Sequence, residues 1–155
     1  MQYVLVVVVV GAFAVLFGKI WLKRRQEAPL RREARAQDIT FRTRLDNVKE
    51  RTLQDWSTAL YGEIYLIVRA DAFEISCAIS PIRVVLGLEY YFRARETTIE
   101  VSWLPGIPKR DWIIVTGRQL GKEVRLAIAQ KRNLRDSWNV LVAAGAVPVG
   151  QRRAG

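Results

Sequence analysis

The sequence predicts a mainly β, α+β fold: an N-terminal transmembrane helix, a linker, and a small β-barrel or sandwich of six or seven strands closed by a C-terminal α-helix. Three observations predict it. Residues 1–18 contain no charged side chain, residues 62–129 alternate apolar and polar residues in short runs, and apolar residues at helical spacing follow the last run. A chain of 155 residues has room for about one soluble domain beside the anchor.

The N-terminal segment is expected to span a membrane. Residues 3–22 would form a helix of about 30 Å, which matches the hydrocarbon core of a bilayer. The valines of 6–10 would favour a strand in water, but a lone segment in lipid can satisfy its backbone groups only as a helix. A cleaved signal peptide would need a basic n-region and a small-x-small cleavage site, and a buried core helix would be shorter with a polar face. We therefore assign residues 1–22 to an uncleaved anchor.

Positive charges follow this segment and none precedes it. The basic residues, called the basic collar below, are Lys19, Lys23, Arg24, Arg25, Arg31, Arg32 and Arg35. By the positive-inside rule, the N-terminus lies outside the cell membrane and the soluble domain is cytoplasmic. The collar residues are candidates for contact with anionic lipid headgroups, each worth about 1 kcal/mol near the surface. The alternative is that they only set the topology.

The charge distribution argues against binding to nucleic acid. The formal net charge is +10, but residues 19–35 supply half of it and Arg152 and Arg153 in the tail (148–155) add two more charges. The remaining residues are close to balance. A nucleic-acid-binding domain would carry a basic face with aromatic side chains between the charges. We therefore expect the membrane and a protein as partners, and no nucleic acid.

Residues 23–60 are expected to form a basic juxtamembrane segment and a linker. Pro29 suits the first turn of a short helix within the spacer. The alternation of residues 40–43 is typical of a strand. A short helix at about 45–60 is predicted because apolar residues recur there at roughly helical spacing: Leu45, Val48, Leu53, Trp56 and Leu60.

The soluble domain is expected to cover residues 61–147. Its predicted strands are 63–69, 73–79, 83–94 with a bulge or a bend at Gly87, 97–103, 112–116 and 123–129. Asn133 is predicted as the N-cap of the closing helix, and Gly145 as the residue that ends it. The apolar face of this helix is Leu134, Trp138, Leu141 and Val142. We expect Trp138 to be buried against Trp112, Val124 and Leu126.

This pattern resembles the bacterial pleckstrin-homology-like (PH/GRAM-type) domains, some of which also follow a transmembrane anchor. The resemblance covers about residues 60–147. It rests on the start at Gly62, Tyr65 and Leu66, the strand pair around Trp112 and Leu126, and the closing helix with Trp138, Leu141, Ala144 and Gly145. It implies a small barrel with a capping helix and a binding or scaffolding role. It carries over no individual binding residue.

The composition excludes most familiar catalytic sites. With no histidine, the chain cannot build a Ser-His-Asp triad, a Cys-His dyad or an imidazole zinc site. The single cysteine, Cys77, excludes an intramolecular disulfide, and its apolar strand predicts a buried, inert thiol. Residues 117–123 differ from a phosphate-binding loop by one residue fewer between the glycines, and Glu123 stands where Mg²⁺ needs Ser or Thr. We predict no catalytic residue, cofactor or metal.

The preferred hypothesis is a single-pass, membrane-anchored, non-enzymatic binding or scaffolding module. Trp103, Lys109 and Arg110 are the candidate headgroup or partner contacts within its domain. The alternative is a small accessory subunit of a membrane protein complex, whose helix packs through the small-xxx-small pair Ala14 and Gly18. An enzyme of unrecognised type is the third hypothesis.

Overall fold

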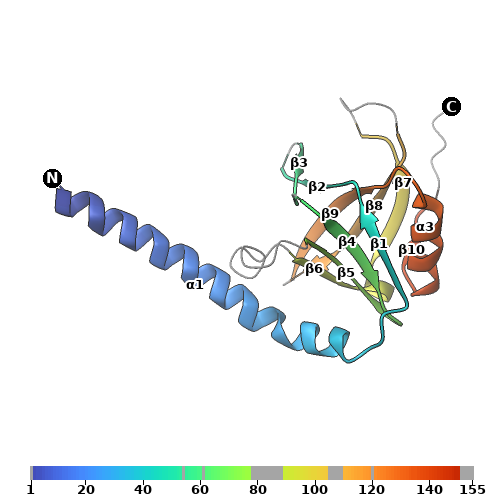
Figure 1. Cartoon of the computed structure of the whole chain (residues 1–155), viewed down its shortest axis with the longest axis horizontal. Coiled ribbons are helices and arrows are strands. Elements are labelled where there is room, and N and C mark those ends of the chain that lie inside the picture. Colours follow the sequence, from blue (N-terminus) through green and yellow to red (C-terminus); the bar gives the residue numbers. More distant parts are fainter. Residues whose placement is uncertain are drawn as a thin grey trace.

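A long helix precedes a folded unit of two β-sheets and a second helix (Figure 1). The computed structural model describes residues 2–53, 55–60, 62–77, 89–104, 110–119 and 121–150. Among these residues there are ten strands, in a four-stranded and a six-stranded sheet. The α+β class is therefore confirmed, with more strands than the six or seven expected.

The first helix, α1 (Gln2–Arg35), contains the apolar segment and continues well past it. Within Tyr3–Arg35, an 18-residue stretch has a mean hydropathy of 2.5, and none of that stretch is buried within the protein. In the described part of the chain, α1 is the one helix long and apolar enough to cross a membrane. Pro29 lies inside α1, so the short helix expected to start there is wrong. A proline costs the interior of a helix one backbone hydrogen bond, yet α1 continues past Pro29 to Arg35, and Glu33 in this last part pairs with Arg93 of β6.

The four-stranded sheet is antiparallel throughout, in the order β1-β4-β5-β6. Its strands are β1 (Phe41–Leu45), β4 (Ile64–Val68), β5 (Ala72–Cys77) and β6 (Glu89–Arg93). The β4–β5 hairpin lies where the sequence placed two strands. Residues 78–88, which include the predicted bend at Gly87, lie outside the described residues.

The six-stranded sheet has the order β10-β7-β8-β9-β2-β3, with β10 parallel to β7 and the other pairs antiparallel. Its strands are β7 (Thr98–Ser102), β8 (Trp112–Gln119), β9 (Lys122–Ala129), β2 (Asn47–Arg51), β3 (Trp56–Thr58) and β10 (Val147–Pro148). The 3₁₀ turn η1 (Ala94–Glu96) joins β6 to β7. β8 runs beyond the predicted 112–116, and its hairpin with β9 turns at Gly121 in a left-handed conformation (φ 76°).

The helix predicted at 45–60 is wrong, because β1, β2 and β3 occupy this stretch. Asp46 alone separates β1 from β2, and the chain crosses there from one sheet to the other. Leu45 and Val48 both point into the core. The bend at Asp46 adds one residue to the two-residue period of a strand, which produces the spacing of three that imitated a helix. The folded unit consequently begins at Phe41, and not at the expected residue 61.

The main core lies between the two sheets. Leu66 and Ile75 from one sheet meet Ile113 and Ile128 from the other, and all four side chains are fully buried. The rings of Phe73 and Phe92 stack with their centroids 5.1 Å apart. Among the residues that the structure describes, no strand is hydrogen-bonded to the second side of β6, so the two sheets do not close into a complete barrel there.

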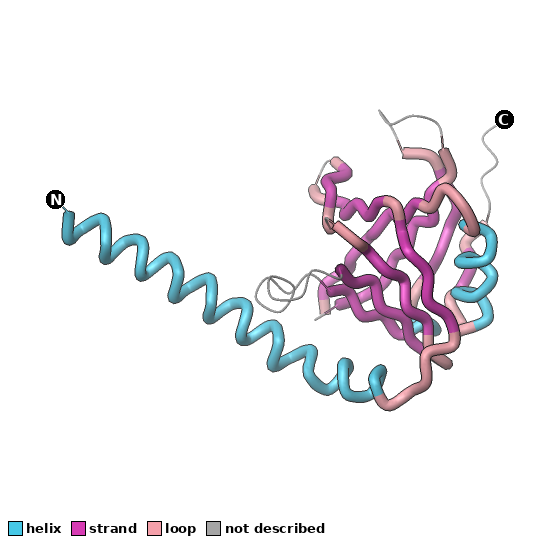
Figure 2. Tube along the Cα trace, viewed as in Figure 1, coloured by secondary structure: helices cyan, strands magenta, loops and turns pink. Residues whose placement is uncertain are grey.

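The second α-helix, α3 (Leu134–Ala143), packs on the core at the side away from the N-terminal end of α1 (Figure 2). Asn133 occupies the N-cap position, but its backbone is left-handed (φ 66°) and its side chain makes no capping hydrogen bond. The predicted end at Gly145 is confirmed: with φ at 109°, Gly145 donates its N–H to Val142, and Ala146 donates to Leu141. These two bonds are the pair expected where glycine ends a helix.

Trp138 and Trp112 do not pack against each other as expected. Trp138 is only half-buried and packs against the main core, whereas Trp112 belongs to a second apolar cluster on the other face of the six-stranded sheet. The two faces of a strand are separated because successive side chains point in opposite directions. The expected contact between Trp138 and Trp112 is therefore wrong. The predicted burial of Cys77 is confirmed.

Candidate functional site

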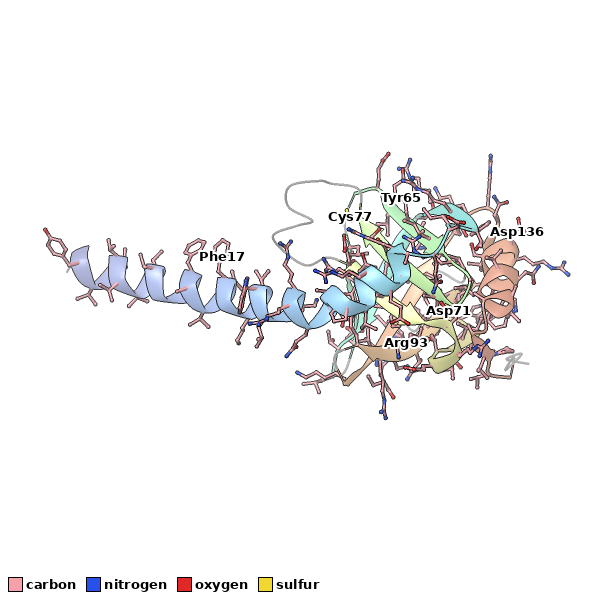
Figure 3. All side chains as sticks on the ribbon, turned by 90° about the horizontal axis from the view of Figure 1, so that it is seen from below. Phe17, Tyr65, Asp71, Cys77, Arg93 and Asp136 are labelled. Carbon is pink, nitrogen blue, oxygen red and sulfur yellow. The ribbon has the colours of Figure 1, made fainter. Side chains whose placement is uncertain are left out.

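The last turns of α1 lie across the folded unit and join it through polar side chains. In Figure 3 these turns pass close to Asp71 and Arg93, while Phe17 lies far out on the helix and Asp136 lies at the opposite end of the protein. Arg93 pairs with Glu33 of α1 at 3.1 Å, and Asp71 accepts a hydrogen bond from the Gln37 side chain just beyond α1. The apolar part of this junction includes the buried Ala34. The junction is therefore predominantly polar.

The centre of the junction is a buried carboxylate on α1. Glu27 is only 1% exposed. It accepts a hydrogen bond from Arg31 at 2.9 Å, one turn along α1, and another from Gln119 at the end of β8, also at 2.9 Å. Lys23 lies 3.9 Å from the same carboxylate. Because a buried charge is costly unless it is paired and hydrogen-bonded, this set of partners is what allows Glu27 to lie inside.

Arg31 links Glu27 to the four-stranded sheet. Its guanidinium lies 3.5 Å from Glu89 of β6 and 5.4 Å from the centroid of the Tyr91 ring. The Tyr91 hydroxyl donates a hydrogen bond to Glu89 at 2.9 Å. Burial raises the pKa of Tyr91 above its ordinary value, with further contributions from Glu74 and Glu89, whereas Arg31 lowers it. We call Glu27, Arg31, Glu89, Tyr91 and Gln119 the junction cluster.

The residues of the basic collar fall into two groups, those with partners at the junction and those exposed to solvent. Arg31 points to the sheet and is 20% exposed, and Lys23 is near Glu27. Arg24 is half-buried, and the Arg25 guanidinium lies 5.4 Å from the centroid of the Trp21 ring. The fully exposed members are Lys19, Arg25, Arg32 and Arg35. Contact of these exposed side chains with lipid stays a prediction. Arg31, in contrast, pairs with Glu27 of α1 and with Glu89 of β6.

A pocket of about 520 Å³ lies between α1 and the folded unit, beside the junction cluster. Leu30 and Ala34 of α1 and Phe92 of β6 provide apolar wall, and charged side chains of both signs surround it. The charged residues in its wall are Glu33, Asp71, Arg93, Arg95, Glu96 and Arg118. Among the residues that the structure describes, no group of three His, Cys, Asp or Glu side chains could hold a metal ion.

The residues predicted for the domain itself lie at the β7–β8 end of the six-stranded sheet. Trp103 is 50% exposed, and its indole N–H donates to Asp111 at 3.0 Å. The Arg110 guanidinium lies 4.3 Å from the centroid of the buried Trp112 ring. Lys109 lies outside the described residues. The structure therefore brings Trp103 and Arg110 to one end of one sheet, well separated along the chain from the collar.

Sequence reasoning missed the junction cluster. Glu27 and Arg31 stand four residues apart, a spacing that signals an ion pair on a helix, and this was the available sign that α1 continues through Pro29. No pattern in the neighbouring residues indicates that Glu89 or Gln119 belongs to the site, because Gln119 and Glu27 are 92 residues apart in the sequence.

The comparisons with known proteins add no relative. No protein-family model matches this chain, and the search of curated proteins finds no significant match.

Proposed function

We propose that the protein is a single-pass, membrane-anchored, non-enzymatic binding or scaffolding module with a cytoplasmic PH-like domain. The observation that carries this proposal is the continuity of α1, which runs from the apolar segment into the junction cluster without a break. From Leu22 to Glu27 the helix rises only about 8 Å. A domain attached this way is held at the membrane surface, where confinement raises its effective concentration for partners.

Two features support a PH-like identity for the domain. Its two sheets share one bent stretch, β1 and β2, around the main core, and α3 covers one side of that core. This arrangement agrees with the small barrel and capping helix that the sequence resemblance implies. The insertion of β3 and the open side at β6 are departures from a plain closed barrel.

The orientation follows from the basic collar, and protease protection tests it. Intact cells are treated with a protease from outside, and the folded unit is detected by an antibody to the C-terminal region. We expect full protection in intact cells and digestion after the membrane is opened. Digestion in intact cells would place the domain outside and overturn the proposed topology.

The exposed collar side chains are proposed to contact anionic headgroups. A peptide of residues 19–37 should bind vesicles that contain anionic lipid and dissociate as salt is added, because salt screens exposed charges. A matched peptide with glutamine at positions 19, 25, 32 and 35 should bind much less. Equal binding of the first peptide to neutral and anionic vesicles would leave the collar with a topological role alone.

The accessory-subunit alternative has one specific observation in its favour. The membrane-facing part of α1 is exposed on all sides, and a Cβ placed on Gly18 would meet nothing within 4 Å. The small residues Ala14 and Gly18 therefore leave room for a second helix to approach closely. Purification in mild detergent distinguishes the alternatives: an accessory subunit should lose its co-purifying membrane protein in Gly18→Leu and keep it in Val15→Leu. A partner held by the domain should stay with both variants.

A further inference from the structure

The β2–β3 hairpin presents an apolar side chain to solvent at its tip. Leu53 is completely exposed. The turn is held by the Thr52 N–H, which donates to the Asp55 carbonyl at 2.9 Å. Below the tip, the Arg51 guanidinium lies 5.6 Å from the centroid of the Trp56 ring. This hydrogen bond closes the hairpin beside Leu53, so the leucine projects from the end of β2 and β3 without any change in these strands.

This hairpin adjoins the second apolar cluster on the outer face of the six-stranded sheet. Trp56 packs against that cluster, which contains Trp112 and Ala127. In the strand register, the hairpin tip lies at the end of the sheet opposite to Trp103. We call Arg51, Leu53 and Trp56 the tryptophan edge.

The position of the hairpin relative to α1 determines what the hairpin faces. In Figure 1, β3 lies on the side of the folded unit that is nearest the N-terminal half of α1. The junction cluster fixes the unit on α1 a few turns from the apolar segment. Transmembrane helices cross a bilayer with a tilt of about 20° on average. The side that looks back along α1 is therefore the side that faces the bilayer.

The chemistry of the tryptophan edge fits the boundary between headgroups and acyl chains. Tryptophan favours that level, and leucine can enter the acyl region beneath it. Along the hairpin, Lys49 and Arg51 are balanced by Glu50 and Asp55, so net charge does not supply the attraction. The apolar side chains do so, while the collar supplies the charge.

We propose that the tryptophan edge is a second membrane contact, in which Leu53 inserts into the interface of the same bilayer that α1 crosses and Trp56 lies at the headgroup level. This inference rests on the proposed anchoring and adds the bilayer as a ligand of the domain itself. It gives the protein two attachments to lipid, one along α1 and one at the β2–β3 hairpin, at the edge of the six-stranded sheet.

Spin labels in the full chain, reconstituted in nanodiscs of mixed neutral and anionic lipid, test this inference. Single labels are placed by Leu53→Cys, Phe13→Cys and Asp136→Cys, and the parent chain gives the background of the buried Cys77. Each position is measured for collisions with oxygen, which concentrates in lipid, and with a water-soluble nickel complex. Since Leu53 and Asp136 are exposed, labelling them should leave the circular dichroism spectrum unchanged.

The three positions separate the outcomes. We expect the labels at 13 and 53 to collide preferentially with oxygen and the label at 136 to collide preferentially with nickel. If position 53 behaves like 136 while 13 is in lipid, the second contact is overturned and the anchor stands. If position 13 is also in water, the proposed anchoring itself is overturned.

Discussion

Arg31 on α1 and Glu89 on β6 form an ion pair at 3.5 Å, and this pair joins the long helix to the four-stranded sheet. Both side chains are largely removed from solvent, and the same guanidinium also holds Glu27 at 2.9 Å. One cation thus serves two buried carboxylates from different elements. The attachment of the domain to its helix depends on this shared charge.

Removal of this cation should weaken the protein strongly. Arg31→Met keeps the aliphatic part of the side chain but leaves Glu27 and Glu89 without their shared partner. A buried ion pair that loses one member typically costs about 3–5 kcal/mol. We expect a clearly lower thermal midpoint for the full chain in detergent, and increased cleavage by protease between α1 and β1.

The matched control for this substitution is Arg32→Met, one residue along the same helix. Arg32 is exposed, so its loss should change the midpoint little. Equal midpoints for the two variants would show that the junction cluster does not hold the domain on α1.

Stability should fall in alkaline solution through Tyr91. Its pKa in the folded protein lies above the ordinary 10.0, so the folded state keeps a proton that the unfolded state releases. Stability is therefore full below pH 10 and decreases as the pH rises above it. Urea unfolding at about pH 8 and about pH 11 should show a larger loss for the parent than for Tyr91→Phe. The same loss in both proteins would mean that Tyr91 titrates normally.

The closing helix should contribute through Leu141 more than through Trp138. Leu141 is fully buried, and its replacement by alanine typically costs about 2–5 kcal/mol. Trp138 is half-buried, so Trp138→Ala should cost less than the full amount for a buried tryptophan. Arg135 is exposed, and Arg135→Ala should be nearly silent. A Leu141→Ala midpoint equal to that of the parent would mean that α3 is not part of the core.

Gly117 on β8 should not tolerate a side chain. A Cβ at this position would lie 2.6 Å from the ring of Phe92, which is stacked on Phe73 and cannot easily move. We expect Gly117→Ala to destabilise the protein by about 1–3 kcal/mol, the usual cost of overpacking. Gly150→Ala, where a Cβ meets nothing within 4 Å, is the control and should match the parent. The free energies are measured by urea unfolding.

Several parts of the fold were predictable because their signal lies in neighbouring residues. The β4–β5 and β8–β9 hairpins follow from alternation around a turn, and the end of α3 follows from Gly145. The prediction failed at Leu45 and Val48, where the bend at Asp46 changed the period. A single-residue bend has no composition signal of its own, so periodicity alone cannot distinguish it from a helical turn.

For the candidate site, the positive charges of the collar could be predicted from the sequence. Which of them pair with buried carboxylates and which stay exposed could not. Whether an arginine faces lipid or a buried carboxylate depends on which side of α1 the sheet covers. Arg31 and Arg32 are adjacent and chemically identical, yet one pairs with Glu27 and Glu89 and the other lies in solvent.

Four features follow from local sequence alone: the apolar helix, the positive charge on its C-terminal side, the alternating strands and the amphipathic α3. Each of these depends on side chains within a few residues of one another, which interact in the same way in any chain that contains them. Long-range packing accounts for the continuation of α1 through Pro29, the burial of Glu27 against Gln119, and the position of β3 on the side nearest the N-terminal half of α1. These features depend on pairs of residues brought together from distant parts of the chain, and their burial turns ordinary surface charges into the contacts that orient the domain.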